Sequence, residues 1–181
     1  MRLPDVRLDL VTDRGVFAGD RLDRGTDTLL RRGERAVPAG PVLDLGCGYG
    51  PIALTLARRN PSVTVWAVDV NERARDLCAE NARAAGLRNV EVRAPEDVPD
   101  DVTFAALWSN PPIRIGKPAL HELLLRWLGR VAPDGASHLV VHKHLGSDSL
   151  ARWLGAQGWD VVRRLSHDGY RLLDVTRPAP A

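Results

Sequence analysis

The sequence predicts one α/β domain built on a doubly wound, seven-stranded, mostly parallel sheet that ends in an antiparallel hairpin. Short apolar segments alternate with amphipathic segments of helical length, an order typical of parallel β-α-β units. Most of the apolar segments are continuous, which indicates strands that are buried on both faces. Near the C-terminus, His-Asp-Gly separates two strand-like segments, and this pattern favours a hairpin.

Composition sets the limits of this prediction. The chain has 181 residues and no linker, so we expect a single domain over residues 1–181. Its net charge of +2 and pI near 8.8 permit a nucleic-acid partner without requiring one. Cys47 and Cys78 form no CxxC pair, which argues against a disulfide scaffold and fits a cytoplasmic location. We expect neither a signal peptide nor a membrane helix, because no apolar run approaches roughly 18 residues.

The N-terminal elements come first. Residues 6–12 alternate between apolar and polar side chains and are expected to form a strand. A turn then leads into the apolar residues 16–18. Residues 25–36 are expected to be helical, with Thr26 as a candidate N-cap.

The middle of the chain alternates regularly between expected strands and expected helices. The expected strands are 41–45, 63–70, 89–94 and 102–110. The expected helices are 51–60 and 71–86, and the second of these is closed by Gly86.

The last third continues the alternation and then turns back on itself. A helix is expected from Lys117 to the Pro-Asp-Gly at 133–135, followed by a strand over 136–144. The next helix should begin at a Ser147 cap and stop at Gly158. The hairpin strands are 159–166 and 170–177, and residues 177–181 are expected to be a disordered tail.

A glycine-rich turn between strand 41–45 and the next helix is the first candidate binding site. Gly46, Gly48 and Gly50 let the backbone approach a ligand and adopt positive φ angles. A dinucleotide fingerprint would need a third glycine where Pro51 stands, so a nicotinamide cofactor is disfavoured. Asp44, directly before the glycines, would repel a pyrophosphate but suits a ligand with an ammonium group.

The next strand ends at a second acid, Asp69, 19 residues beyond Gly50. An acid at this place can accept hydrogen bonds from both ribose hydroxyls. The two features together describe an adenosine ligand that has no phosphates and carries a positive end, as S-adenosyl-L-methionine (SAM) does. Either feature alone could be structural, a tight turn in one case and a solvated strand end in the other.

At these residues the chain resembles the class I SAM-dependent methyltransferases. "VLDLGCGYG" is similar to their first motif and "VDVN" to their second. Residues 15–30 together with Asn-Pro-Pro at 110–112 resemble, more narrowly, the small-domain methyltransferase family. Its best-known members methylate the amino nitrogen of a guanine in small-subunit ribosomal RNA. The resemblance spans residues 15–176 and implies a Rossmann-like fold, SAM as cofactor, S-adenosyl-L-homocysteine as product and RNA as substrate.

The resemblance also implies a set of cofactor contacts, with residues 1–25 forming N-terminal strands and a lid over the cofactor. Asp23, Gly25 and Thr26 would close over its methionine end. The implied cofactor-binding residues are Thr26, Asp44, Gly46, Cys47, Gly48, Gly50, Pro51, Asp69, Val70, Asn71, Ala94, Pro95, Glu96 and Asn110.

Asn-Pro-Pro has a chemical reason to follow the buried strand 102–110. An exocyclic amine is a poor nucleophile because its lone pair is delocalised into the ring. The Asn110 side-chain oxygen and the Pro111 carbonyl can accept its two N–H bonds, while Pro112 stiffens the turn. Such positioning can raise a rate by about 10²–10³ without a metal or a covalent nucleophile. By itself, this motif could also be only a rigid turn.

The residues after the prolines depart from the best-known members of the family. Ile113 stands where many relatives have Phe or Tyr to stack on the base, and Arg114 stands where the guanine enzymes often have His. "NPPIRIGK" resembles a single-domain branch of the family. Arg114, Lys117 and Lys143 are candidate contacts to RNA phosphates. His142 and His144 should share a strand face, but no third ligand accompanies them, so we expect no metal site.

Three functional hypotheses remain at this point. The favoured one is transfer of a methyl group to an exocyclic amino nitrogen, with guanine N2 in ribosomal RNA as the main candidate. The same chemistry would also suit a protein-glutamine or DNA-adenine methyltransferase. A non-catalytic SAM-fold module that binds RNA or a partner is the alternative from another class.

Overall fold

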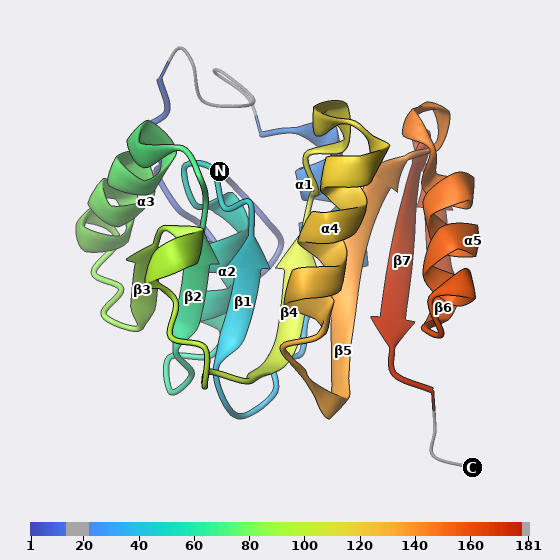
Figure 1. Cartoon of the computed structure of the whole chain (residues 1–181). Helices are drawn as coiled ribbons and strands as arrows, with labels where there is room; N and C mark the ends of the chain where they lie inside the picture. The colour runs from blue at the N-terminus through green and yellow to red at the C-terminus, as the bar shows by residue number, and fades with distance from the viewer. Residues whose placement is uncertain (14–21, 179–181) are drawn as a thin grey trace.

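The computed structural model describes residues 1–13 and 22–178, and it shows a central sheet with helices on both sides (Figure 1). The predicted segment 16–18 and the end of the tail, 179–181, lie outside the described residues. The helices are α1 (Arg24–Arg32), α2 (Pro51–Arg59), α3 (Glu72–Ala84), α4 (Lys117–Leu128) and α5 (Ser147–Ala156). Three short 3-10 helices are η1 (Pro95–Asp97), η2 (Ile113–Ile115) and η3 (Lys143–Leu145). The strands are β1 (Val42–Leu45), β2 (Val65–Val68), β3 (Val90–Arg93), β4 (Phe104–Ser109), β5 (Val131–His142), β6 (Asp160–His167) and β7 (Tyr170–Thr176).

The seven strands form one sheet in the order β3-β2-β1-β4-β5-β7-β6. Neighbours from β3 to β5 are parallel, whereas β7 runs antiparallel to both β5 and β6. The order reverses between β1 and β4, as in doubly wound sheets. The predicted Rossmann-like, mostly parallel sheet with a C-terminal antiparallel hairpin is therefore confirmed.

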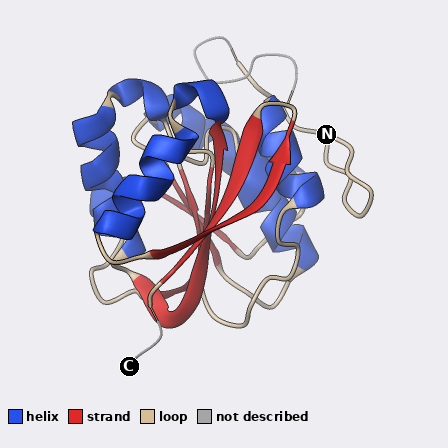
Figure 2. Cartoon of the chain, turned by 90° about the vertical axis from the view of Figure 1, so that its right-hand side faces the viewer, coloured by secondary structure: helices blue, strands red, loops and turns tan. Residues whose placement is uncertain are grey.

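Each face of the sheet is covered by its own set of helices (Figure 2). On one face, α1, α2 and α3 contribute Leu29, Leu54 and Cys78 to a shared apolar cluster. On the other, α4 and α5 contribute residues such as Trp127 and Leu154, both fully buried. Burying a large apolar side chain stabilises the fold by roughly 1.5–3 kcal/mol, so the helical stripes that the sequence shows hold the layers together.

The tight turn of the C-terminal hairpin is as predicted. Asp168 and Gly169 join β6 to β7, with φ angles of 47° and 82°. Two consecutive positive φ angles match the twist of the flanking strands, which is why Asp-Gly is favoured there.

The predicted N-terminal strand 6–12 is wrong. Val6 and Leu8 are buried, as its alternation indicated, but the only β pairing of this described segment is an isolated bridge between Arg2 and Arg7. The backbone N–H and C=O of Val11 instead bond to the side chain of Asn81, at 2.7 and 2.8 Å. An amide side chain of α3 thus satisfies the polar groups that a neighbouring strand would have taken.

Two predicted helix caps are also wrong. Asp23, rather than Thr26, caps α1, and its Oδ1 accepts the Thr26 N–H at 3.0 Å. This helix ends at Arg32 instead of residue 36. Ser147 is the first residue of α5, whose N-cap is Gly146.

The predicted boundary at Pro-Asp-Gly, 133–135, is wrong as well. The helix α4 ends at Leu128, and the three residues lie inside β5, which pairs with β4 from Val131 onward. The register of the β4–β5 pairing shifts between Phe104 and Ala106, and this irregularity accommodates the three residues within the strand. Sheet pairing therefore overrides the local turn signal. At the other end, Lys143 and His144 leave the strand and form η3.

Candidate active site

Most of the predicted site residues follow the carboxyl ends of neighbouring parallel strands, at one end of the sheet (Figure 1). The glycine turn follows β1, Asp69 follows β2, Ala94 follows β3 and Asn110 follows β4. Because β1 and β4 are adjacent and the chain leaves them toward opposite faces, their loops part at this point. The topology therefore brings the glycine turn and Asn-Pro-Pro together.

The glycine turn requires its glycines for two different reasons. Gly46, Gly48 and Gly50 have φ angles of 76°, 55° and 95°. A Cβ on Gly46 or Gly48 would meet open space, whereas one on Gly50 would lie 2.8 Å from the Cys78 sulfur. The first two glycines thus flank room for a ligand, and the third is required by packing.

Asp44 lies under this turn and is fully buried. Its Oδ2 accepts the Ala53 N–H at 2.8 Å, in the first turn of α2, while its Oδ1 has no partner among the described residues. Burial raises the pKa of Asp44 to about 8, the Ala53 N–H opposes this, and the charge of Asp69 adds to it. A buried carboxyl oxygen without a partner favours a cationic ligand, because a nearby cation stabilises the ionised form.

Asp69 ties the second strand to the glycine turn. Its two oxygens accept the N–H groups of Gly48 and Asn71, each at 2.9 Å. Asn71 in turn caps α3, and its Oδ1 accepts the Ala74 N–H at 3.4 Å. Val70 is 80% exposed. These bonds fix the direction of Asp69 and leave lone pairs on both of its oxygens.

The segment after β3 and the residues next to the glycines complete the predicted cofactor set. Ala94 is buried before η1, Pro95 accepts a hydrogen bond from Arg126 at its carbonyl, and Glu96 is exposed. Cys47 is buried beside Cys78, and hydrogen bonding to Cys78 together with burial raises its thiol pKa. Cys47 is therefore a protonated packing residue here, and its backbone N–H bonds to Val68.

Asn110 is held from two sides by residues of the N-terminal part. Its Nδ2 donates to Asp23 Oδ1 at 2.7 Å and to Thr26 Oγ1 at 3.1 Å. The same Asp23 oxygen caps α1. Because both N–H groups of the carboxamide are bonded, the Asn110 oxygen is fixed as an acceptor, and none of the described residues donates to it.

The residues after Asn110 form a tight turn. The Pro111 carbonyl accepts the Ile113 N–H at 2.8 Å, and Pro112 between them has φ −74° and ψ 70°. These angles describe an inverse γ-turn. One lone pair of the Pro111 carbonyl is thus engaged within the turn, and the second is free for a substrate.

The three predicted phosphate contacts all lie on the surface near this turn. Arg114 is in η2, Lys117 begins α4 and Lys143 begins η3. All three are exposed, and none has an acidic partner among the described residues. Ile113 and Lys117 also line a cavity of about 30 Å³ between α4 and α5, together with Leu145.

Sequence reasoning missed the supports of this site. It associated Asp23 with the cofactor alone, although the N-cap preference for Asp could have pointed to its role in α1. A Cβ on Gly25 would lie 2.8 Å from the Tyr170 ring, so Tyr170 packs directly on the start of α1. The His142 ring meets Tyr170 edge-on, with 4.9 Å between centroids. No local signal in the C-terminal hairpin predicts these contacts.

Among the described residues, no group of three or more His, Cys, Asp or Glu side chains could hold a metal ion. His142 and His144 lie near each other, with 5.4 Å between ring centroids, but on different elements. Within 1–13 and 22–178, no helix has the length and apolar character to cross a membrane.

Comparison with known proteins gives close sequence relatives. The chain is 36% identical over 151 residues to the uncharacterized protein YbxB of Bacillus subtilis, covering 82% of this chain and 75% of that protein. It is 34% identical over 181 residues to ribosomal RNA small subunit methyltransferase C of Pseudomonas aeruginosa, covering 97% and 53%. The chain thus spans about half the length of the relatives that carry this name.

Solved structures with the same fold are numerous. The 16S rRNA N2 methyltransferase RsmC of T. thermophilus, in complex with AdoMet and guanosine, has a TM-score of 0.67 at 23% identity and covers 91% of this chain and 46% of that one. The precorrin-6y methyltransferase of Geobacter metallireducens has a TM-score of 0.68 at 13% identity and covers 94% and 95%. At these identities the likeness concerns the fold.

The protein family of this chain is shown by a family model that matches most of its length. The methyltransferase small domain matches residues 7–166, which include the glycine turn, Asp69 and Asn110. Two relatives more than 30% identical to this chain agree with that match. This chain belongs to the methyltransferase small domain family.

Proposed function

We propose that this chain transfers a methyl group from SAM to an exocyclic amino nitrogen, and that its target is guanine N2 in ribosomal RNA. The observation that carries the proposal is the geometry of Asn110. Asp23 and Thr26 bind both N–H groups of its carboxamide, so the oxygen is presented as an acceptor at the end of β4. An exocyclic amino group has two N–H donors and matches two acceptors, the Asn110 oxygen and the Pro111 carbonyl, whereas a hydroxyl brings one donor and a carbon nucleophile none.

The cofactor site combines three groups. Asp44 would take the ammonium group of SAM on its unpartnered Oδ1, and Asp69 would accept the ribose hydroxyls. The open space beside Gly46 and Gly48 would admit the cofactor next to the backbone. SAM supplies a methyl group on a sulfonium centre that is already a good leaving group.

The residues of the chain then act on the substrate amine. The Asn110 oxygen and the free lone pair of the Pro111 carbonyl accept its two N–H bonds, which directs the nitrogen lone pair away from both acceptors. As positive charge develops on the nitrogen, the same oxygens stabilise it. The Pro112 turn keeps the two acceptors in place, and the nitrogen afterwards loses one proton to solvent.

RNA is the substrate class that the surface and the relatives favour. Arg114, Lys117 and Lys143 place three cations around the turn that have no acidic partner within residues 1–13 and 22–178, as phosphate contacts require. Relatives at 30–34% identity are named as methyltransferases of small-subunit ribosomal RNA. Ile113 would cover the base by apolar contact, without the stacking of about 1–3 kcal/mol that an aromatic ring adds.

The experiment separates cofactor binding from transfer. Tritiated SAM is incubated with total RNA, DNA and protein from a strain that lacks this gene, and the labelled fraction is digested and analysed by mass spectrometry. We expect label in N2-methylguanosine of ribosomal RNA. Label in methyladenine of DNA or in methylglutamine of protein would replace the proposed substrate, and RNA binding without label in any fraction would indicate a non-catalytic module.

The matched variants are Asn110→Ala and Asp69→Ala. Asn110→Ala should lower the transfer rate by about 10² or more and leave SAM affinity, measured by calorimetry, within a few-fold of wild type. Asp69→Ala should weaken SAM binding itself. Full transfer activity in Asn110→Ala would contradict the proposed mechanism.

A further inference from the structure

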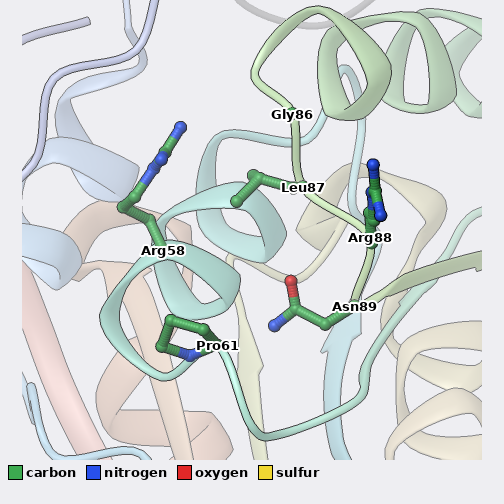
Figure 3. Close-up of a pocket in the computed structure, with 6 residues that line it drawn as sticks. All are labelled: Arg58, Pro61, Gly86, Leu87, Arg88 and Asn89. Atoms are coloured by element: carbon green, nitrogen blue, oxygen red, sulfur yellow. The ribbon is translucent and has the colours of Figure 1, made fainter.

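A cavity outside the candidate active site lies at the opposite end of the sheet from it. It has a volume of about 380 Å³ and is lined by Arg58, Pro61, Gly86, Leu87, Arg88 and Asn89. These residues come from the end of α2, the α2–β2 turn and the α3–β3 loop (Figure 3). Its volume falls in the range of about 300–1,000 Å³ that is typical of small-ligand pockets.

Asn89 contributes a fixed acceptor to this cavity. Its Nδ2 donates to the carbonyl oxygens of Ala57, Asn60 and Val63, at 3.2, 3.2 and 2.8 Å. These bonds prevent the carboxamide from turning over, and no described residue donates to its oxygen. Figure 3 shows that oxygen directed toward Leu87. A ligand that reaches it must therefore bring a donor such as a ring N–H or an amino group.

Two guanidinium groups flank the acceptor. Figure 3 shows Arg58 and Arg88 on opposite sides of Leu87 and Asn89. Both are exposed, and neither forms an ion pair with a described residue. Among the described residues, the Arg58 side chain donates only to the Ala85 carbonyl, at 2.7 Å, and it retains other N–H donors. The cavity thus has cations on two sides, with an apolar surface on Leu87 and an acceptor between them.

We propose that this cavity binds one nucleotide of the RNA substrate at a distance from the methylated base, an inference that rests on the proposed function. The base lies against Leu87 and donates to Asn89, and Arg58 and Arg88 contact the phosphates on either side of that nucleoside. Arginines on two opposite sides match a nucleoside within a chain, which has two phosphates, better than a free monophosphate. The contact would give the domain a second hold on RNA, away from Arg114 and Lys117.

The test uses the full chain and a fluorescein-labelled, mixed-sequence, single-stranded RNA of 20 nucleotides, with anisotropy measured over a series of KCl concentrations. The variants are Arg58→Gln with Arg88→Gln, and Arg152→Gln as a control, because Arg152 is an exposed arginine of α5 that bonds to no other side chain among the described residues. We expect the double variant to bind about tenfold more weakly, with a salt slope smaller by about 1.4 for two lost phosphate contacts. The control should stay within about twofold of wild type.

Several results would overturn the inference. One is a double variant that binds RNA as tightly as the control. Another is free guanosine monophosphate that competes as strongly as the RNA, since the cavity would then hold a free nucleotide. A third is binding of polyglutamate that the double variant weakens as much as it weakens binding of RNA, since the cavity would then accept acidic peptides. SAM affinity should be equal in all variants, because the cavity lies at the opposite end of the sheet from the cofactor site.

The two proposals fail in different ways. If the wild type binds RNA and the double variant weakens that binding, while no methyl group is transferred, only the proposed reaction is overturned. If the wild type methylates RNA and the double variant binds it equally well, only the second contact is overturned. A wild type that binds no RNA overturns both.

Discussion

Asp44 allows a test of the cofactor site that needs no RNA. The carboxyl is fully buried, and burial raises its pKa to about 8 against the lowering effect of the Ala53 N–H. At pH 7, one unit below that value, roughly nine in ten of these carboxyls hold a proton. An ammonium group placed at the free Oδ1 favours the ionised form, so SAM binding should expel the proton.

The expected magnitude follows from the same pKa. Binding at pH 7 should release about 0.9 proton per SAM from Asp44, and at pH 8 about half a proton. Calorimetric titrations in phosphate and in Tris buffer at one pH measure this number, because the observed enthalpy changes with the ionisation enthalpy of the buffer. The variant Asp44→Asn keeps an acceptor for Ala53 and cannot release the proton. The difference in proton release between wild type and variant gives the contribution of Asp44 separately from that of the SAM amino group.

Equal proton release in both proteins would refute the reasoning, since Asp44 would then not change its charge when SAM binds. The raised pKa also has a consequence for stability. A pKa that is higher in the folded state stabilises the fold fully below pH 4 and loses this effect as pH rises through about 8. Asp44→Asn should therefore raise the melting temperature more at pH 9 than at pH 4.

The remaining predictions concern the scaffold and are checked by thermal unfolding. Gly50→Ala should destabilise the fold by about 2–4 kcal/mol, because Gly50 has φ 95° and the new Cβ would lie 2.8 Å from a buried sulfur of α3. Gly155→Ala, in α5 with open space around it, should be neutral or stabilising, and an equal loss in both variants would contradict the packing argument. Burial raises the pKa of Asp174, but hydrogen bonds from His138 and Arg164 outweigh this and lower it. Wild type should therefore be more stable than Asp174→Asn at pH 6 and lose that advantage below pH 4, and an advantage independent of pH would argue against the ion pairs.

Most of the fold was predictable because the sheet is parallel and buried. A continuous apolar run such as the one before Asn110 must be buried on both faces, and in a domain of this size the central strands of a covered sheet provide that position. The helices between these runs carry clear apolar stripes. The prediction failed where a local signal competed with a distant partner. Pro-Asp-Gly at 133–135 indicates a turn in isolation, yet β4 holds it within β5. Residues 6–12 alternate as a strand does, yet Asn81 satisfies the backbone of Val11.

The positions of the candidate site residues in the fold were predictable in part for a similar reason. The glycine turn, Asp69 and Asn110 are each recognisable within a few residues of a strand end, where a doubly wound sheet binds its ligands. The capping of α1 was not, because Asp23 and Thr26 are both favourable N-cap residues and only the backbone geometry distinguishes them. The packing of Tyr170 against Gly25 joins residues from the two ends of the chain, so no local pattern reveals it.

For this protein, the sequence by itself determined which residues carry reactive groups and on which strand ends they stand, because periodicity and turn chemistry are local properties. Only the tertiary structure decided how those groups are directed. The Asn110 carboxamide has an oxygen and a nitrogen of nearly equal size, and its sequence neighbours do not determine which of them is left as a free acceptor. Hydrogen bonds from its nitrogen to Asp23 and Thr26, 87 and 84 residues away, make that choice. Direction at a site is set by partners that the fold brings together, and those partners are distant in the chain.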